Sequence, residues 1–234
     1  MINFSKRSYQ KELLDGDAIA PEDLFRNLQE LNFINHWLGG HAITIAGFAA
    51  FTQKGNTINS LAEIGCGGGD NLKAIIKHHQ KRNVSTLNTI GIDMKADCIA
   101  YASEQLKKYS ATWICSDYQL VNWVYDAKPD IIFSSLFCHH FTEEELVQQL
   151  RWMHSESKFG FFINDLQRHP LAYYSIKWLT KLFSQSYLVK NDAPLSVLRG
   201  FTKKEWTAFL NKAGIKNYTI QWKWAFRYLI IVHK

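Results

Sequence analysis

The sequence contains few cysteines and no long hydrophobic run, and both absences restrict what the protein can be. Its four cysteines show no paired C-x-x-C spacing, which argues against a disulfide framework or a zinc site and predicts reduced thiols. The longest apolar stretch, about Ala42 to Phe51, is too short to cross a bilayer, and no apolar signal segment follows the first residues. We therefore expect a cytoplasmic protein with no membrane span and no metal site.

Two common phosphate-binding signatures are also missing from the glycine-rich stretch 65–69, in which four of the five residues are glycine. This stretch joins an apolar run ending at Ile64 to a helical pattern over 71–80, so peptide N–H groups and a helix N-terminus would point at a ligand. A dinucleotide fingerprint requires glycine where Asp70 stands, and no Gly-Lys-Ser/Thr follows. Glu63 and Asp70 instead suit a ligand that carries an ammonium or a sulfonium.

Three later segments place polar residues after predicted strands. Asp93 ends the run 89–93, Asp117 follows 113–116, and the run 130–136 leads into Phe-Cys-His-His-Phe at 137–141. With Glu63-x-Gly65-x-Gly67-x-Gly69, these landmarks resemble those of the class I S-adenosylmethionine-dependent methyltransferases over about residues 60–165. The resemblance implies S-adenosylmethionine as cofactor, with its ribose at Asp93 and its adenine near Asp117. The implied cofactor-binding residues are Glu63, Gly65, Cys66, Gly67, Gly69, Asp70, Asp93, Met94, Asp117, Tyr118 and Ser134.

Asp93 and Asp117 each have a structural alternative. Asp93 could cap the helix expected from about Lys95, which is compatible with ribose binding, and Asp117 could be a cap or turn residue before Tyr118.

The pattern of short apolar runs and helical segments predicts an α/β fold with a parallel, doubly wound sheet. Strands are expected near 60–64, 88–92, 112–115, 130–135 and 158–164, with a terminal hairpin over 216–222 and 225–232. Thr142 and Thr202 begin capping boxes. The resemblance implies a Rossmann-like, mostly parallel seven-stranded sheet with helices on both faces and a C-terminal antiparallel hairpin.

One α/β domain with a small N-terminal appendage is expected, because two full domains would be cramped in 234 residues. Residues 1–55 would form a helical cap, with helices over 21–37 and 41–51, and 56–234 would form the cofactor-binding methyltransferase domain. An insertion at about 168–199, which contains the aromatic helix 172–179, is the expected substrate lid.

His139 and His140 are the candidate bases, because an unperturbed pKa near 6.5 suits proton uptake at neutral pH and both follow the fourth strand. Adjacent side chains diverge, so we expect at most one to face the substrate, and His140 is favoured. The alternative is that one of them packs in the core or caps the helix at Thr142.

Substrate-orienting roles are predicted for three residues. Asp165 ends the fifth strand, where open α/β sheets bind ligands. Similarity to a bacterial methyltransferase subgroup, in Glu12 to Asp15 and in Asn35 to Gly40, implies that Asp165 and Arg168 line the acceptor pocket. Arg168 could bind a carboxylate or phenolate with its bidentate fork, and Arg199 could close over the pocket. A purely structural Asp165–Arg168 pair is the alternative.

Charge adds a second class of partner. The net charge is +6, and from Arg199 onward eight basic residues face Glu205 alone, an excess of 8 − 1 = +7. This end could meet an anionic substrate, an acidic carrier protein or RNA, or it could be a solvated face.

The leading interpretation is an S-adenosylmethionine-dependent methyltransferase of a small molecule, acting on oxygen of an aromatic or polyketide-like acceptor. An RNA or protein methyltransferase and a non-catalytic S-adenosylmethionine-binding module stay open, as does a homodimer. Ser-Ser-Leu-Phe at 134–137 replaces the Asn/Asp-Pro-Pro-Tyr/Phe that base N-methylation would require. An NAD-dependent oxidoreductase is the most distant alternative, because Asp93 would suit a ribose there too.

Overall fold

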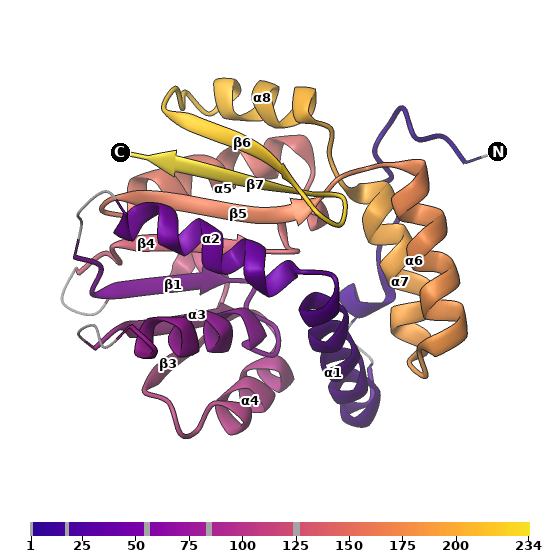
Figure 1. The fold of residues 1–234 in the computed structure, drawn as a ribbon, viewed down its shortest axis with the longest axis horizontal. Helices are drawn as coiled ribbons and strands as arrows, with labels where there is room; N and C mark the ends of the chain where they lie inside the picture. Colours follow the sequence, from indigo (N-terminus) through magenta and orange to yellow (C-terminus); the bar gives the residue numbers. More distant parts are fainter. Residues whose placement is uncertain (1, 17–18, 54–56, 83–85, 124–126) are drawn as a thin grey trace.

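A seven-stranded sheet in the order β3-β2-β1-β4-β5-β7-β6 organises the protein (Figure 1). The computed structural model describes residues 2–16, 19–53, 57–82, 86–123 and 127–234. Strands β1 to β5 pair in parallel, whereas β7 runs antiparallel to both β5 and β6. This arrangement confirms the predicted fold. The strands are β1 (Ser60–Ile64), β2 (Asn88–Asp93), β3 (Ala111–Cys115), β4 (Ile131–Ser135), β5 (Gly160–Leu166), β6 (Tyr218–Lys223) and β7 (Arg227–His233).

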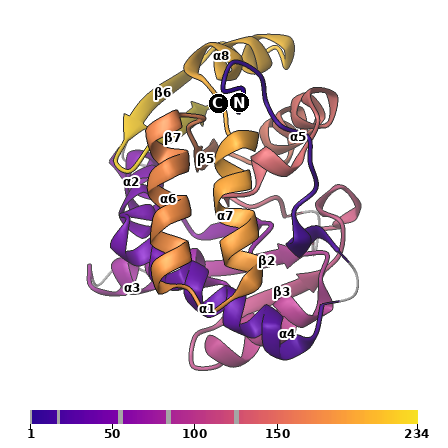
Figure 2. The same cartoon turned by 90° about the vertical axis from the view of Figure 1, so that its right-hand side faces the viewer.

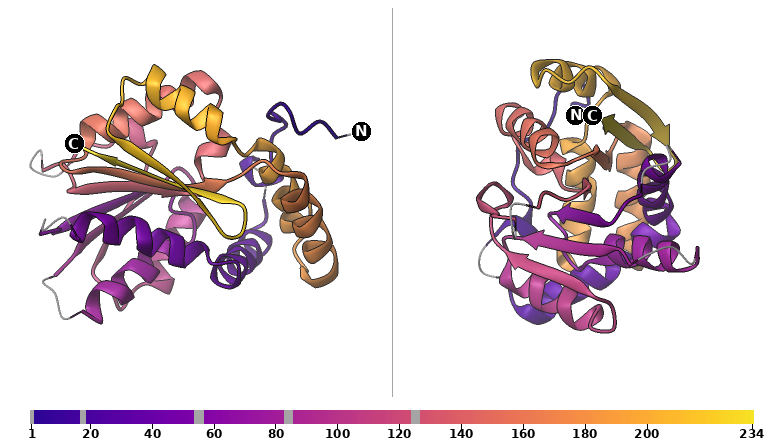
Figure 3. Two further views of the ribbon diagram at one scale, coloured as in Figure 1. Left: turned by 45° about the horizontal axis from the view of Figure 1, so that its top comes forward. Right: turned by 90° about the vertical axis from the view of Figure 1, so that its left-hand side faces the viewer.

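Helices cover both faces of the sheet (Figure 3). The α-helices are α1 (Pro21–Trp37), α2 (Gly40–Thr52), α3 (Asp70–Gln80), α4 (Ala96–Gln105), α5 (Glu143–Glu156), α6 (Pro170–Phe183), α7 (Tyr187–Arg199) and α8 (Lys203–Lys212). Single 3₁₀ turns are η1 (Leu13–Asp15), η2 (Tyr118–Leu120) and η4 (Cys138–His140).

Successive residues of the central strands supply two separate cores, because side chains of a strand alternate between its faces. Ile132 and Ile163 pack with α5 and α8, whereas Phe133 and Phe162 pack with α2 and α3. Both faces are therefore buried, as the nearly continuous apolar runs of these strands require. Helix α2 approaches closely at Gly47, where a Cβ would lie 2.4 Å from the Phe162 ring.

The local start signals act as predicted. Thr142 and Thr202 each accept from the backbone N–H three residues later, and each of the following glutamates accepts from the capping residue's N–H. Pro21 is in the first turn of α1, where its missing N–H costs nothing.

Three helices lie beyond the carboxyl ends of the parallel strands. Helices α6 and α7 run side by side, and α1 passes across their ends (Figure 2). The segment predicted as a lid around one aromatic helix thus contains two helices, and α7 continues through Pro194. The predicted domain boundary between residues 55 and 56 lies outside the described residues.

Candidate functional site

The strand order reverses between β1 and β4, and ligands of open α/β sheets bind at such a point. The glycine turn follows β1 and η4 follows β4, while Asp165 lies at the end of β5. Three neighbouring strand ends therefore bring the predicted cofactor turn, the histidines and one predicted substrate residue to the same edge.

The glycine turn has a backbone that favours glycine. Gly65, Gly67 and Gly69 have φ of 65°, 49° and 72°. A Cβ on Gly65 would lie 2.3 Å from the Phe137 ring. The Cys66 N–H donates to the Ile92 carbonyl, which fixes the turn to β2, and the Cys66 side chain is buried. Leu28 of α1 lies beside Gly67 and Gly68, so the N-terminal helix covers the turn.

Three carboxylates surround the turn. Glu63 is 1% exposed, and its Oε2 has no hydrogen-bond partner. Burial, followed by the charges of Asp70 and Asp93, raises the Glu63 pKa well above its usual value. Asp70 is held by Asn35 Nδ2 at 3.1 Å and His41 Nε2 at 2.7 Å. Such a site favours a cationic ligand, which would lower the cost of ionised Glu63.

Asp117 makes the capping contact considered as its alternative, whereas the N-cap of α4 is Lys95 and not Asp93. Asp93 accepts from the N–H groups of Gly67 and Lys95, each at 2.9 Å, and so ties the turn to the start of α4. Asp117 caps η2 by accepting from the Gln119 N–H at 2.9 Å. Carboxylate oxygens have lone pairs beyond these bonds, so ribose and adenine contacts stay compatible with them.

The other predicted cofactor residues differ in exposure. Met94 is exposed, whereas Ser134 is buried with its Oγ 3.4 Å from Cys138 Sγ. Tyr118 is also buried, and burial raises its pKa to about 12. Its ring packs edge-on against Phe137, which links η2 to the glycine turn.

We expect Glu63→Gln to stabilise the ligand-free protein in a pH-dependent way. Because the folded-state pKa of Glu63 is raised, the wild type loses stability as pH rises above the unfolded value of 4.5, until the folded group ionises. Glutamine does not ionise, so the Glu63→Gln variant keeps this stability as the pH rises. Each tenfold change in the acid dissociation constant corresponds to ~1.4 kcal/mol, or about 3–5 °C in Tm for a chain of this size.

Melting curves from pH 4 to 8 should show the Tm of Glu63→Gln rising above that of the wild type as pH increases, by at least about 3–5 °C. Glu104→Gln, at an exposed position, is the control. A difference independent of pH would contradict the buried carboxylate.

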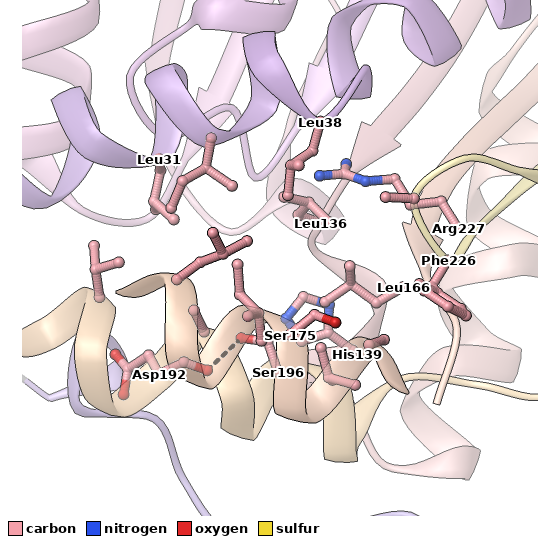
Figure 4. Close-up of a pocket in the computed structure, with 18 of the residues that line it drawn as sticks. Leu31, Leu38, Leu136, His139, Leu166, Ser175, Asp192, Ser196, Phe226 and Arg227 are labelled. Atoms are coloured by element: carbon pink, nitrogen blue, oxygen red, sulfur yellow. Dashed lines mark hydrogen bonds between the residues drawn. The ribbon is translucent and has the colours of Figure 1, made fainter. Parts of the chain in front are cut away.

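A cavity of about 370 Å³ adjoins the histidines (Figure 4). Leu31 of α1 and Leu38, the residue after α1, face Ser175 of α6 and Ser196 of α7 across it. The wall is largely apolar. Its charged or ionisable residues are Glu12, His139, His140, Asp192 and Arg227, of which Glu12 and the two histidines lie together.

His139 is held between two carboxylates. Its Nδ1 lies 2.7 Å from Asp165 Oδ1, and its Nε2 lies 3.5 Å from Glu12 Oε1. Burial lowers the His139 pKa, but the Asp165 and Glu12 carboxylates raise it more, to about 9. Burial alone would raise the Asp165 pKa, but His139 lowers it by more, so the net shift of the Asp165 pKa is downward. The expectation of a His139 pKa suited to proton uptake at neutral pH was therefore wrong for the ligand-free protein.

His140 lies beside His139 and also lines the cavity. The two rings are 4.5 Å apart, and His140 Nδ1 lies 2.9 Å from Asp15 Oδ1. The two side chains were expected to diverge but do not, because the tight turn of η4 and the carboxylates of Glu12 and Asp15 direct both rings to one side. That at most one of them faces the substrate stays a prediction. The His140 side chain is 19% exposed and that of His139 3%.

Glu12 and Asp15 were not predicted as site residues. Glu12 is buried, accepts from Ser196 Oγ at 2.8 Å and lies on the cavity wall. No sequence signal joins Glu-Leu-Leu-Asp at 12–15 to a histidine pair more than 120 positions later. Arg227 was missed too; burial lowers its pKa to about 10, and it donates to Asn35 Oδ1.

The two arginines predicted to bind substrate make internal contacts. Arg168 donates to the carbonyls of Phe4 and Gly200 and to Glu205 Oε1 at 2.7 Å. Its partner is thus Glu205, whereas Asp165 pairs with His139, so the alternative Asp165–Arg168 pair does not form.

Arg199 holds the histidine turn. It donates to the carbonyls of His139, His140 and Gln10. Among the described residues, the cavity wall does not include Asp165, Arg168 or Arg199, which lie behind it. Burial of Arg199 and Arg227 also removes two basic residues from the positively charged C-terminal end.

Comparison with known proteins agrees with this geometry. Residues 61–158 match the family described as a methyltransferase domain. No curated protein matches the chain by sequence. The match runs from β1 to the end of α5, which is less than half of the chain, and the sheet has the class I methyltransferase fold.

Solved structures with this fold include methyltransferases of several kinds. The plantazolicin methyltransferase BpumL in complex with SAH has a TM-score of 0.61 and 20% identity over 86% of this chain and 76% of that one. Human N-acetylserotonin methyltransferase in complex with SAM has a TM-score of 0.64 and 14% identity, over 92% of this chain and 56% of that one. Magnesium protoporphyrin IX methyltransferase from Synechocystis PCC 6803 has a TM-score of 0.51 and 12% identity, over 94% of this chain and 86% of that one. In the described chain, no helix is long and apolar enough to cross a membrane.

Proposed function

We propose that this protein is an S-adenosylmethionine-dependent methyltransferase that methylates an oxygen of a small aromatic or polyketide-like acceptor. The observation that carries the proposal is one juxtaposition. A glycine turn surrounded by carboxylates packs against Phe137, and the neighbouring residues Leu136, His139 and His140 line an apolar cavity. The matched methyltransferase domain and the SAH or SAM in similar structures support it.

The residues around the turn fit this cofactor. Gly65, Gly67 and Gly69 let the backbone take the left-handed turn that would present peptide N–H groups to the ligand, and the unpartnered Glu63 Oε2 with Asp70 suits its positive charges. Asp93 would hold the ribose, and Asp117 and Tyr118 would border the adenine. When bound, S-adenosylmethionine supplies a methyl group on a sulfonium that an acceptor oxygen can attack.

The cavity fits an acceptor of modest size. A volume of about 370 Å³ lies within the range of small-molecule sites, and leucine and isoleucine side chains from α1 and α6 would bind an apolar body. Polar groups at one end would bind the hydroxyl and fix its orientation. His140 is the better candidate for taking the proton, because it is more exposed than His139 and Asp15 orients its ring.

We expect Asp93→Ala to weaken S-adenosylmethionine binding by ~1–3 kcal/mol, the cost of leaving buried polar partners unpaired. Titration calorimetry measures the affinity, and a thermal melt of each protein shows whether the turn still folds. Asp97→Ala, in the first turn of the helix α4 that follows Asp93, is the matched control and should bind normally. Equal affinity in Asp93→Ala and wild type would exclude the ribose contact.

We expect His140→Ala to lower methyl transfer about 10²-fold at unchanged cofactor affinity, because the acceptor loses the group that activates it. The assay follows labelled methyl transfer to a panel of phenols and hydroxyquinones, with wild type, His139→Ala and His140→Ala in parallel. His154→Ala, on α5, is the control. Full turnover in both histidine variants would refute their role, and absence of turnover with any acceptor would favour a binding module.

A further inference from the structure

The histidine cluster has a geometry that a base alone does not require. Glu12, His139 and His140 each offer an oxygen or nitrogen atom, and these atoms lie within 4.8 Å of one another. Glu12 Oε1 lies 3.5 Å from His139 Nε2, and Glu12 Oε2 lies 3.8 Å from His140 Nε2. These separations are long for hydrogen bonds. They approach the separation of ~3 Å that two ligand atoms have when both bind the same ion, each at about 2.0–2.2 Å.

Both imidazoles are oriented by a carboxylate on their far side. His139 Nδ1 contacts Asp165 Oδ1 at 2.7 Å, and His140 Nδ1 contacts Asp15 Oδ1 at 2.9 Å. A histidine that donates from Nδ1 to a carboxylate presents the lone pair of Nε2, which is the arrangement that holds metal-binding histidines in place. With both imidazoles neutral, two such lone pairs and the Glu12 carboxylate would point toward one another, and a cation between them would satisfy all three.

The charges around the histidine cluster also favour a bound cation. Four carboxylates, from Glu12, Asp15, Asp165 and Asp192, lie in and around the cluster. Three guanidinium groups, those of Arg7, Arg199 and Arg227, lie close to them. With neutral imidazoles the cluster therefore carries an excess of one negative charge, 4 − 3, which favours a cation.

We propose that Glu12, His139 and His140 bind a divalent first-row transition-metal ion, such as Zn²⁺, Mn²⁺ or Fe²⁺, at the wall of the acceptor cavity. Two imidazoles and one carboxylate are a ligand set that these metals accept, and three protein ligands leave positions open. The open positions face the cavity, because all three residues line it.

The ion would act on the acceptor, a role that rests on the function proposed above. An acceptor hydroxyl that binds the ion has a lowered pKa, so its O–H bond breaks, the proton passes to water and the electron pair stays on the oxygen. Acceptors with two adjacent oxygens, such as catechols and hydroxyquinones, would fill two open positions. A histidine bound through Nε2 has no lone pair left for a proton, so the ion would replace His140 as the activating group.

Cobalt binding tests the site without cofactor or acceptor. Chelator-treated full-length protein is titrated with CoCl₂ by calorimetry and by visible absorption of the Co²⁺ d–d bands. We expect one ion per chain in the wild type, binding at least 100-fold weaker in Glu12→Gln and His140→Ala, and binding ~10–100-fold weaker in Asp15→Asn. His36→Ala, an exposed histidine of α1, should bind as wild type does. Thermal melts identify any variant that fails to fold.

The outcomes separate this inference from the proposed function. No stoichiometric cobalt, or equal binding in wild type and Glu12→Gln, overturns the metal site. Methyl transfer by chelated protein at the full wild-type rate overturns the role of the ion while the proposed function stands. Tight cobalt binding without methyl transfer to any acceptor in the panel would leave the metal site in place and contradict the proposed function.

Discussion

Replacing Gly65 by alanine is expected to lower the free energy of unfolding by ~3–5 kcal/mol and to abolish measurable cofactor binding. Two costs add. The backbone at φ 65° disfavours a Cβ by ~1–2 kcal/mol, and that Cβ would lie 2.3 Å from Phe137, whose ring must move. Phe137 directly precedes η4, so its displacement would also disturb the histidine turn.

Gly214→Ala is the matched control for this prediction. Gly214 has a φ of 81°, and no heavy atom lies within 4 Å of the position that a Cβ would take, so alanine there adds backbone strain without a clash. We expect a loss of ~1–2 kcal/mol and unchanged cofactor affinity. Urea unfolding and titration calorimetry measure both quantities, and equal effects of the two substitutions would show that the Gly65 turn does not exclude a side chain.

Arg199→Met should lower the free energy of unfolding by ~3–5 kcal/mol and abolish methyl transfer. The guanidinium satisfies the carbonyls of three residues, two of which are His139 and His140, and it lies 3.9 Å from Glu12 Oε1. Removing it takes the Arg199 donors from the His140 and Gln10 carbonyls, leaves the His139 carbonyl to Arg7 alone, and takes one cation from beside the Glu12 carboxylate. The turn that presents both histidines would lose its support.

Urea unfolding tests the stability effect, with Arg151→Met as the control. Arg151 is exposed and makes one bond, to the Lys212 carbonyl, so its loss should cost less than ~0.5 kcal/mol. If the two variants unfold at the same urea concentration, Arg199 does not hold η4. Methyl transfer that survives in a folded Arg199→Met protein would show that the turn keeps its shape without the guanidinium.

Features set by local sequence were predictable. The glycine turn between β1 and α3, the capping box at Thr142 and the helix starting at Pro21 all depend on residues within one or two turns of the chain. The hairpin was found with shifted ends, at 218–223 and 227–233. Ala225 and Phe226 look apolar enough to pair but lie in the turn, where Phe226 has a φ of 54°.

Features set by tertiary contacts were not predictable. Glu12 meets His139 because η1 packs against α7 and η4, and nothing near residue 12 encodes that. Helix α7 was missed because Pro194 lies inside it, and proline ordinarily ends a helix. Arg168 and Arg199 resemble ligand-binding residues in sequence, yet their guanidinium groups satisfy buried carbonyls, which only the folded chain reveals.

The most direct test of this account is a crystal structure of the protein with S-adenosylhomocysteine. We predict its amino-acid part at Gly65 to Gly69, its ribose hydroxyls at Asp93 and its sulfur facing the cavity next to His140. A glycine turn without bound ligand at saturating concentration, or a ribose held away from Asp93, would contradict the central claim.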